Sequence, residues 1–144
     1  MKKENIIKLL PYQKPFLFVD ELTYISKNRS EGYYTFKEDE YFYKGHFKSK
    51  PITPGAILTE VMAQIGVVCL GIYLLRNDFS ETKNPQIALT SNEVSFFLPV
   101  KPKERVKVVS DKIYFRFNKL KCNVQLFNQK NELVCKGIIS GMLK

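Results

Sequence analysis

The chain has 144 residues, a length that predicts one compact domain over residues 1–144. Hydrophobic residues make up 44% of it and charged residues 26%, which excludes a disordered chain. The 23 Lys and Arg against 14 Asp and Glu give a formal net charge of +9, which favours an acidic partner or serves only solubility.

The three cysteines stand far apart in apolar runs, which excludes a disulfide scaffold and a CxxC metal site; they are Cys69, Cys122 and Cys135. With a single histidine, no zinc site is expected either. Unpaired thiols suit a reducing compartment, so a cytoplasmic location is expected.

The basic residues are scattered along the chain, as in Lys101, Lys103, Arg105 and Lys107, or Lys119 and Lys121. No run of five like charges occurs in the sequence, so we expect no nucleic-acid partner.

The first part of the chain predicts a short helix and two strands. Residues 4–10 form the helix, which ends at Pro11. Residues 15–26 are rich in aromatic and β-branched residues and predict a strand, and residues 31–37 predict a second strand after a polar turn. Residues 38–54 contain one glycine and two prolines and are expected to be irregular.

A long apolar segment predicts one helix over residues 54–76. Thr53 is a candidate N-cap and Pro54 a candidate first helical residue. Residues 55–75 are long enough to cross a bilayer, but Glu60 within them would be costly in lipid. We therefore expect a helix buried in protein and no membrane insertion.

Four further strands are predicted after this helix, over residues 86–99, 104–117, 119–128 and 132–143. The resulting order is a short helix, two strands, one long helix and four strands. It predicts an α+β fold in which an antiparallel sheet curves around the long helix and buries it.

His46, the only histidine, and Glu60, on the second turn of the predicted helix, form a candidate acid–base pair. Imidazole is the side chain whose unperturbed charge changes near neutral pH. Glu60 is the only acid between Glu40 and Asp78, and a carboxyl group in so apolar a helix would be desolvated and could hold a proton. A proton acceptor and a proton donor together permit general acid–base catalysis. The alternative is that His46 is a packing residue and Glu60 reaches solvent or a lysine.

Gly55 is a candidate oxyanion donor. Its backbone N–H precedes the regular bonding of the helix, whose N-terminus carries a partial positive charge, so this N–H can point at a developing oxyanion. The alternative is that the Thr53 side chain accepts this N–H as an ordinary N-cap.

Three segments of the chain resemble one known family. Residues 45–64, GHFKSKPITPGAILTEVMAQ, resemble the GHFPxxPxxPGxxxxExMAQ segment of the bacterial (3R)-hydroxyacyl-[acyl-carrier-protein] dehydratases. Residues 10–22, LPYQKPFLFVDEL, resemble their LPHRxPFLxVDxx segment, and residues 93–106 fall where they carry a strand, a Pro-Val pair and a turn. The resemblance implies the hotdog fold, a curved antiparallel sheet wrapped around one long helix.

The resemblance also implies an activity, the dehydration of 3-hydroxyacyl thioesters to trans-2-enoyl thioesters in fatty-acid or specialised polyene- or polyketide-like biosynthesis. His46 would be the base, Glu60 the acid, and Gly55 the amide donor to the thioester carbonyl. It implies a homodimer or a higher oligomer with sites between subunits, no metal and no dissociable cofactor. The substrate would hang from the phosphopantetheine of acyl carrier protein, an acidic partner that suits the positive charge.

Some positions depart from the family pattern. Tyr12 replaces a common histidine, and Phe97-Leu98 replaces two basic residues, so the carrier is expected to dock on other groups. These groups are Lys44, Lys48 and Lys50. Aromatic residues near the expected acyl tunnel either narrow it in favour of flat, conjugated chains or simply pack the core. They are Phe16, Phe18, Phe96 and Phe97.

Two other functions fit parts of the pattern. A hotdog acyl thioesterase also places an acid on the helix, although the GHF histidine at this spacing favours the dehydratase. A non-catalytic module would bind the carrier protein without turnover.

Overall fold

The computed structural model describes residues 1–46, 49–77 and 86–143. In this part of the chain six antiparallel strands form one sheet, in the order β1-β2-β4-β5-β6-β3. The strands are β1 (Glu21–Ile25), β2 (Arg29–Thr35), β3 (Ile87–Phe96), β4 (Arg105–Arg116), β5 (Lys119–Phe127) and β6 (Leu133–Leu143). The helical segments are α1 (Lys3–Lys8), the short 3-10 helix η1 (Tyr41–Lys44), α2 (Gly55–Ala63), the π-helical turn η2 (Gln64–Val68) and α3 (Cys69–Leu74).

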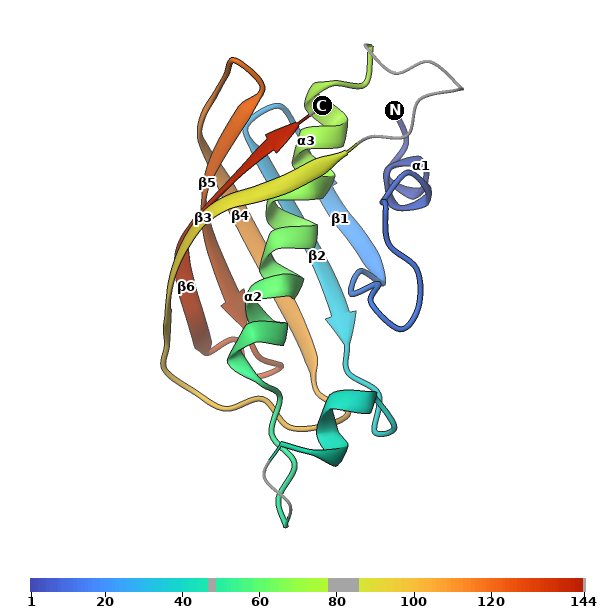
Figure 1. The fold of residues 1–144 in the computed structure, drawn as a ribbon, viewed down its shortest axis with the longest axis vertical. Helices are drawn as coiled ribbons and strands as arrows, with labels where there is room; N and C mark the ends of the chain where they lie inside the picture. Colours follow the sequence, from blue (N-terminus) through green and yellow to red (C-terminus); the bar gives the residue numbers. More distant parts are fainter. Residues whose placement is uncertain (47–48, 78–85, 144) are drawn as a thin grey trace.

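The segments α2, η2 and α3 run on from one another as a single central helix, which lies against one face of the sheet (Figure 1). The central helix contacts five strands, β2 to β6, so the sheet encloses it. By length and composition it could cross a membrane, but 72% of its most apolar stretch is buried inside the fold, as in the core helix of a folded domain. The predicted α+β architecture is therefore confirmed.

The π-helical turn is a feature that the sequence did not predict. Here two buried serine hydroxyls from the sheet donate hydrogen bonds to helix carbonyls: Ser30 to Ile65 at 3.0 Å and Ser110 to Gly66 at 2.9 Å. A π turn departs from the regular pairing of an α-helix, and such turns are frequent at functional sites. A Cβ at Gly66 would lie 3.0 Å from the Cβ of Ser110, so glycine allows this close approach of helix and strand.

The first strand is shorter than predicted, since β1 begins at Glu21 rather than near residue 15. The backbone of residues 16–18 bonds to a side chain of the central helix, and contact with β2 begins only at the Asp20 N–H, which donates to the Tyr33 carbonyl at 2.9 Å. The buried Gln64 accepts a hydrogen bond from the Phe18 N–H at 2.8 Å and donates one to the Phe16 carbonyl at 3.0 Å. These bonds hold residues 16–18 against the helix.

The other predicted elements are confirmed, with shifts of at most three residues at their ends. Most of the polar segment predicted over residues 77–85 lies outside the described residues. The long strand β3 forms one edge of the sheet and pairs only with β6 in the described chain. Several large apolar side chains on β3 and just after it are exposed, namely Leu89, Phe96, Phe97 and Leu98.

Candidate active site

The start of α2 differs from its prediction, because Thr53 does not cap it. The Thr53 hydroxyl lies 2.6 Å from the phenol oxygen of Tyr43, a buried hydrogen bond, and its backbone N–H donates to the Val100 carbonyl at 2.8 Å. Pro54 is the N-cap residue, with extended backbone and no side-chain cap, and α2 begins at Gly55. The predicted N-cap at Thr53 and helical start at Pro54 are thus wrong.

The structure rules out the alternative in which the Thr53 side chain accepts the Gly55 N–H, while the oxyanion role of Gly55 stays a prediction. Within residues 1–46, 49–77 and 86–143, the Gly55 N–H makes no hydrogen bond to the protein. It lies in the first turn of a helix that continues through η2 and α3, where backbone N–H groups favour negative charge. The amide is therefore available to an oxygen of a ligand.

Phe96 contacts the place where a side chain of residue 55 would stand. A Cβ built on Gly55 would lie 3.1 to 3.4 Å from three atoms of the Phe96 ring, which is 47% exposed. The structure thus brings two predicted site residues together, one from the helix start and one from the edge strand. The next residue, Phe97, is also about half exposed.

His46 follows η1 and is held by the segment that leads into α2. Its Nδ1 lies 2.7 Å from the Ile52 carbonyl oxygen. Because a carbonyl oxygen only accepts, Nδ1 carries the proton and the lone pair of the neutral ring is on Nε2. This orientation defines Nε2 as the atom that can act as a base.

Glu60 is partly buried on the second turn of α2, and Gln64 holds its carboxylate. The Gln64 Nε2 donates to Glu60 Oε1 at 3.0 Å and also to the Phe16 carbonyl. Gln64 is fully buried, so its orientation is fixed by these partners. Sequence reasoning did not assign Gln64 a role, although a polar side chain four residues after Glu60 lies on the same helix face.

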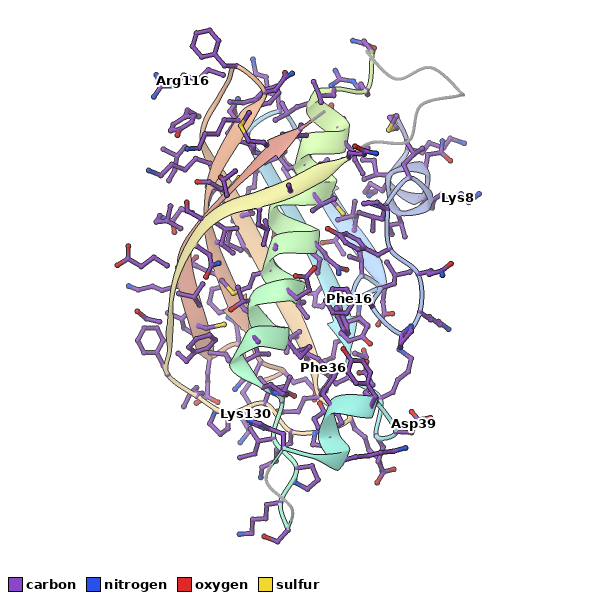
Figure 2. The ribbon with its side chains drawn as sticks, viewed as in Figure 1. Lys8, Phe16, Phe36, Asp39, Arg116 and Lys130 are labelled. Atoms are coloured by element: carbon purple, nitrogen blue, oxygen red, sulfur yellow. The ribbon has the colours of Figure 1, made fainter. Side chains whose placement is uncertain are left out.

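The segment before β1 brings aromatic residues to the side of Glu60. The Tyr12 and Phe16 rings are 6.4 Å apart, and Phe16 and Phe18 meet edge to face at 5.1 Å. Phe16 is 40% exposed (labelled in Figure 2), whereas Phe18 is fully buried in the core against Tyr34. Burial and, secondly, the nearby Glu60 charge raise the pKa of Tyr12 to about 12.

Two of the basic residues predicted for carrier docking can be described, and both are near His46 in the sequence. Lys44 and Lys50 are exposed, at the end of η1 and in the segment before α2, while Lys48 lies outside the described residues. Among the described residues, no three His, Cys, Asp or Glu side chains gather as metal ligands would.

A pocket of about 410 Å³ lies beside this site but contains neither His46, Gly55 nor Glu60. It is lined by the segment before β1, the end of β2 and the start of η1, with Leu17, Val19 and Tyr34 among its apolar residues.

Comparison with solved structures gives the class of the fold. The chain is similar to a structure titled the dehydratase heterocomplex ApeI:P from Xenorhabdus doucetiae, with a TM-score of 0.80 and 11% identity over 96% of this chain and 90% of that one. It is also similar to the thioesterase HI1161 from Haemophilus influenzae, with a TM-score of 0.71 and 12% identity over 100% of this chain and 91% of that one. These likenesses and the sheet topology define a hotdog-fold protein.

The family follows from the sequence comparisons. The model of the FabA-like domain matches residues 10–135. A 3-hydroxyacyl-[acyl-carrier-protein] dehydratase FabZ from Caldicellulosiruptor bescii is 31% identical over 137 residues, 93% of this chain and 92% of the relative. The same-named protein from Clostridium botulinum is 39% identical over 67 residues, so the match spans about half of each chain, 46% in both. The chain belongs to the FabA-like domain family.

Proposed function

We propose that this protein is a 3-hydroxyacyl-[acyl-carrier-protein] dehydratase, which eliminates water from a 3-hydroxyacyl thioester to give a trans-2-enoyl thioester. The observation that carries the proposal is the bond between His46 Nδ1 and the Ile52 carbonyl, at 2.7 Å. It leaves Nε2 as the basic atom of a histidine next to a helix start with an available amide. The named relatives in the same family support the same reaction.

The proposed reaction uses three groups of the site. His46 Nε2 removes the proton from C2, and the electron pair moves toward the thioester carbonyl, whose oxygen the Gly55 N–H stabilises. Glu60, held by Gln64, is the proton donor to the C3 hydroxyl, which leaves as water as the C2–C3 double bond forms. A proton then passes from the imidazolium to the carboxylate, through solvent, to restore the starting state.

We further propose that the working form is a homodimer joined along the β3 edge. The described chain leaves this edge unpaired, and its exposed Leu89, Phe96 and Phe97 would be covered by a second copy. Because Phe96 touches the place of a Cβ on Gly55, such an interface would border the site. His46 of one subunit would then work with Glu60 of the other.

The substrate in this proposal is carried by acyl carrier protein, an acidic partner. The exposed Lys44 and Lys50 flank His46, and the net charge of +9 favours association with an acidic surface. No dissociable cofactor takes part. A cytoplasmic location fits the three buried thiols, and burial raises the pKa of the Cys135 thiol to about 12, which keeps it unreactive.

A second candidate function is thioester hydrolysis, favoured by the fold likeness to the thioesterase HI1161. One assay separates the two. The protein is mixed with 3-hydroxyacyl thioesters of several lengths, on carrier protein and on a small thiol, and enoyl absorbance and free thiol are followed together.

The dehydratase proposal expects enoyl formation without thiol release. A saturated acyl thioester that lacks the 3-hydroxyl group is the matched control and should stay unchanged. Thiol release from both substrates would establish the thioesterase instead, and binding of the carrier protein without either product would establish a non-catalytic module.

A further inference from the structure

The hairpin between β4 and β5 carries an unusual tip. Its two turn residues, Phe117 and Asn118, have φ angles of 51° and 59°. Positive φ at both central residues is the geometry of a type I′ turn, in which Asn and Gly are favoured and a bulky residue is strained. Phe117 nevertheless occupies the first position, and its side chain is 94% exposed.

The strand residues next to this turn are also in an unfavourable arrangement. Arg116 and Lys119 are register partners, so two cations stand directly opposite each other. Two pairs along the strands, Tyr114 stands opposite Lys121, and the Arg116 guanidinium lies over the Tyr114 ring at 4.2 Å. In the described part of the chain, neither Arg116, Lys119 nor Lys121 forms an ion pair with a carboxylate.

More positive charge lies beside the hairpin. The Lys112 N–H donates to the Asn28 carbonyl at 2.8 Å, which brings the turn between β1 and β2 and its exposed Lys27 next to β4. The nearby Asp111 is already paired with Arg29 at 3.1 Å. The exposed phenyl ring is therefore flanked by Arg116 and Lys119, whose charge is not neutralised within the described structure, and further cations lie farther along β4.

The strained aromatic and the opposed cations are local costs that the fold itself does not explain, and an observed outlier of this kind points to a function. We propose that the hairpin tip is a peripheral anchor for an anionic phospholipid surface, with the Phe117 ring at the level of the acyl-chain boundary and the cations at the level of the phosphates. Anionic headgroups would relieve the repulsion between Arg116 and Lys119. No segment has to span the membrane.

The shape of the tip favours a lipid surface over a protein partner. A single projecting ring needs a matching pocket on a protein but enters a lipid interface directly. The hairpin lies at one end of the molecule, and α2 begins at the other (Figure 1), with Arg116 and Lys130 labelled toward opposite ends in Figure 2. The central helix between them has 20 residues and is about 30 Å long. A carrier protein bound at the tip would thus not face the catalytic residues.

The test is co-sedimentation of the full chain with phosphatidylcholine vesicles that do or do not contain phosphatidylglycerol. We expect binding to the anionic vesicles only, weakened by salt. Phe117→Asn should weaken binding at least about fivefold, while Lys119→Gln should weaken it about fivefold. Tyr41→Asn and Lys130→Gln are the matched controls for an exposed aromatic and an exposed charge away from the tip, and both should bind nearly as the unchanged protein does.

Thermal unfolding distinguishes an anchor from a structural role of Phe117. Because Asn tolerates positive φ, Phe117→Asn should raise the Tm by about 2–4 °C while it loses lipid binding. Equal binding by Phe117→Asn and the unchanged protein, or binding of neutral vesicles as well as anionic ones, overturns the proposal. So does absence of vesicle binding, whether or not an acidic carrier protein binds in a Phe117-dependent way.

Discussion

The two halves of the central helix have different relations to the rest of the molecule. In α2 the helix is only partly covered, and it presents Gly55 and Glu60 at its accessible side. From Gln64 to Ile72 every residue is buried, and the sheet serines bond to the π-helical turn. The covered half fixes the helix on the sheet. The half that carries Gly55 and Glu60 can therefore stay accessible while these two residues keep a fixed position.

Gln64 stands at the boundary between the two halves. Its amide bonds to the backbone of residues 16–18 on one side and to the Glu60 carboxylate on the other. The comparison therefore predicts that changes in the accessible half alter the reaction, changes in the covered half alter stability, and changes at Gln64 alter both.

The largest effect is expected in the accessible half. His46→Ala and Glu60→Gln should each lower the dehydration rate by ~10²–10⁴, because each removes a positioned proton-transfer group. Neither change should shift the free energy of unfolding by more than about 0.5–1 kcal/mol, since both side chains are partly exposed. The rate is measured by enoyl absorbance and stability by urea unfolding. Retention of a tenth of the activity by His46→Ala would show that the base is another residue.

Mixing these two inactive proteins tests the shared site. If His46 and Glu60 of one site come from different subunits, a mixed dimer has one site with both intact residues, so full exchange restores about a quarter of the activity. Absence of any recovery, once mass spectrometry shows mixed dimers, would place both residues of a site in one subunit.

Gln64→Leu should affect both properties. Leucine has a similar size but makes no hydrogen bonds, so the Phe18 N–H and the Phe16 carbonyl lose their partner, at a cost of about 1–3 kcal/mol. The Glu60 carboxylate also loses its hydrogen bond from Gln64 and is no longer held in place. We therefore expect kcat to fall by a larger factor than KM rises. Gln13→Leu, at an exposed position, is the control and should change neither. An effect on stability alone would reduce Gln64 to a packing residue.

A smaller effect is expected from the covered half. Ser110→Ala removes the donor to the buried Gly66 carbonyl and should cost about 1 kcal/mol of unfolding free energy, with kcat unchanged. Ser30→Ala should behave in the same way at the Ile65 carbonyl. A large loss of kcat in a stably folded Ser110→Ala protein would contradict the separation of the two halves.

The smallest effect concerns alkaline stability near the start of α2. The pKa of Tyr43 is raised to about 12, mainly by burial. The hydrogen bond with Thr53 acts in the opposite direction and lowers this pKa. The unfolded chain ionises this phenol near pH 10, so the stability it contributes is fully present below pH 10 and is lost as the pH rises through 12. Tyr43→Phe should therefore lose less stability than the unchanged protein between pH 8 and pH 11, measured by urea midpoints.

Particular residues show what the sequence can and cannot predict here. The strands and the central helix follow from local periodicity, which depends only on neighbouring residues. Residue type and position make His46, Gly55 and Glu60 candidates, the family resemblance implies their roles, and these roles remain predictions. The bonds of Gln64 to residues 16–18, of Ser110 to Gly66 and of Thr53 to Tyr43 join segments whose partners no local pattern specifies. Thr53 is an example: its residue type favours an N-cap, but its hydroxyl hydrogen-bonds to Tyr43 of η1 instead of capping α2.

The close contact of Phe96 with Gly55 has a genetic consequence. A methyl group at position 55 and the ring in its present place would overlap by a few tenths of an ångström, so the two positions share one volume. Substitutions there are expected to be epistatic: Gly55→Ala becomes better tolerated together with Phe96→Leu than alone. Positions 55 and 96 are thus expected to change together among related sequences, although they lie far apart in the chain.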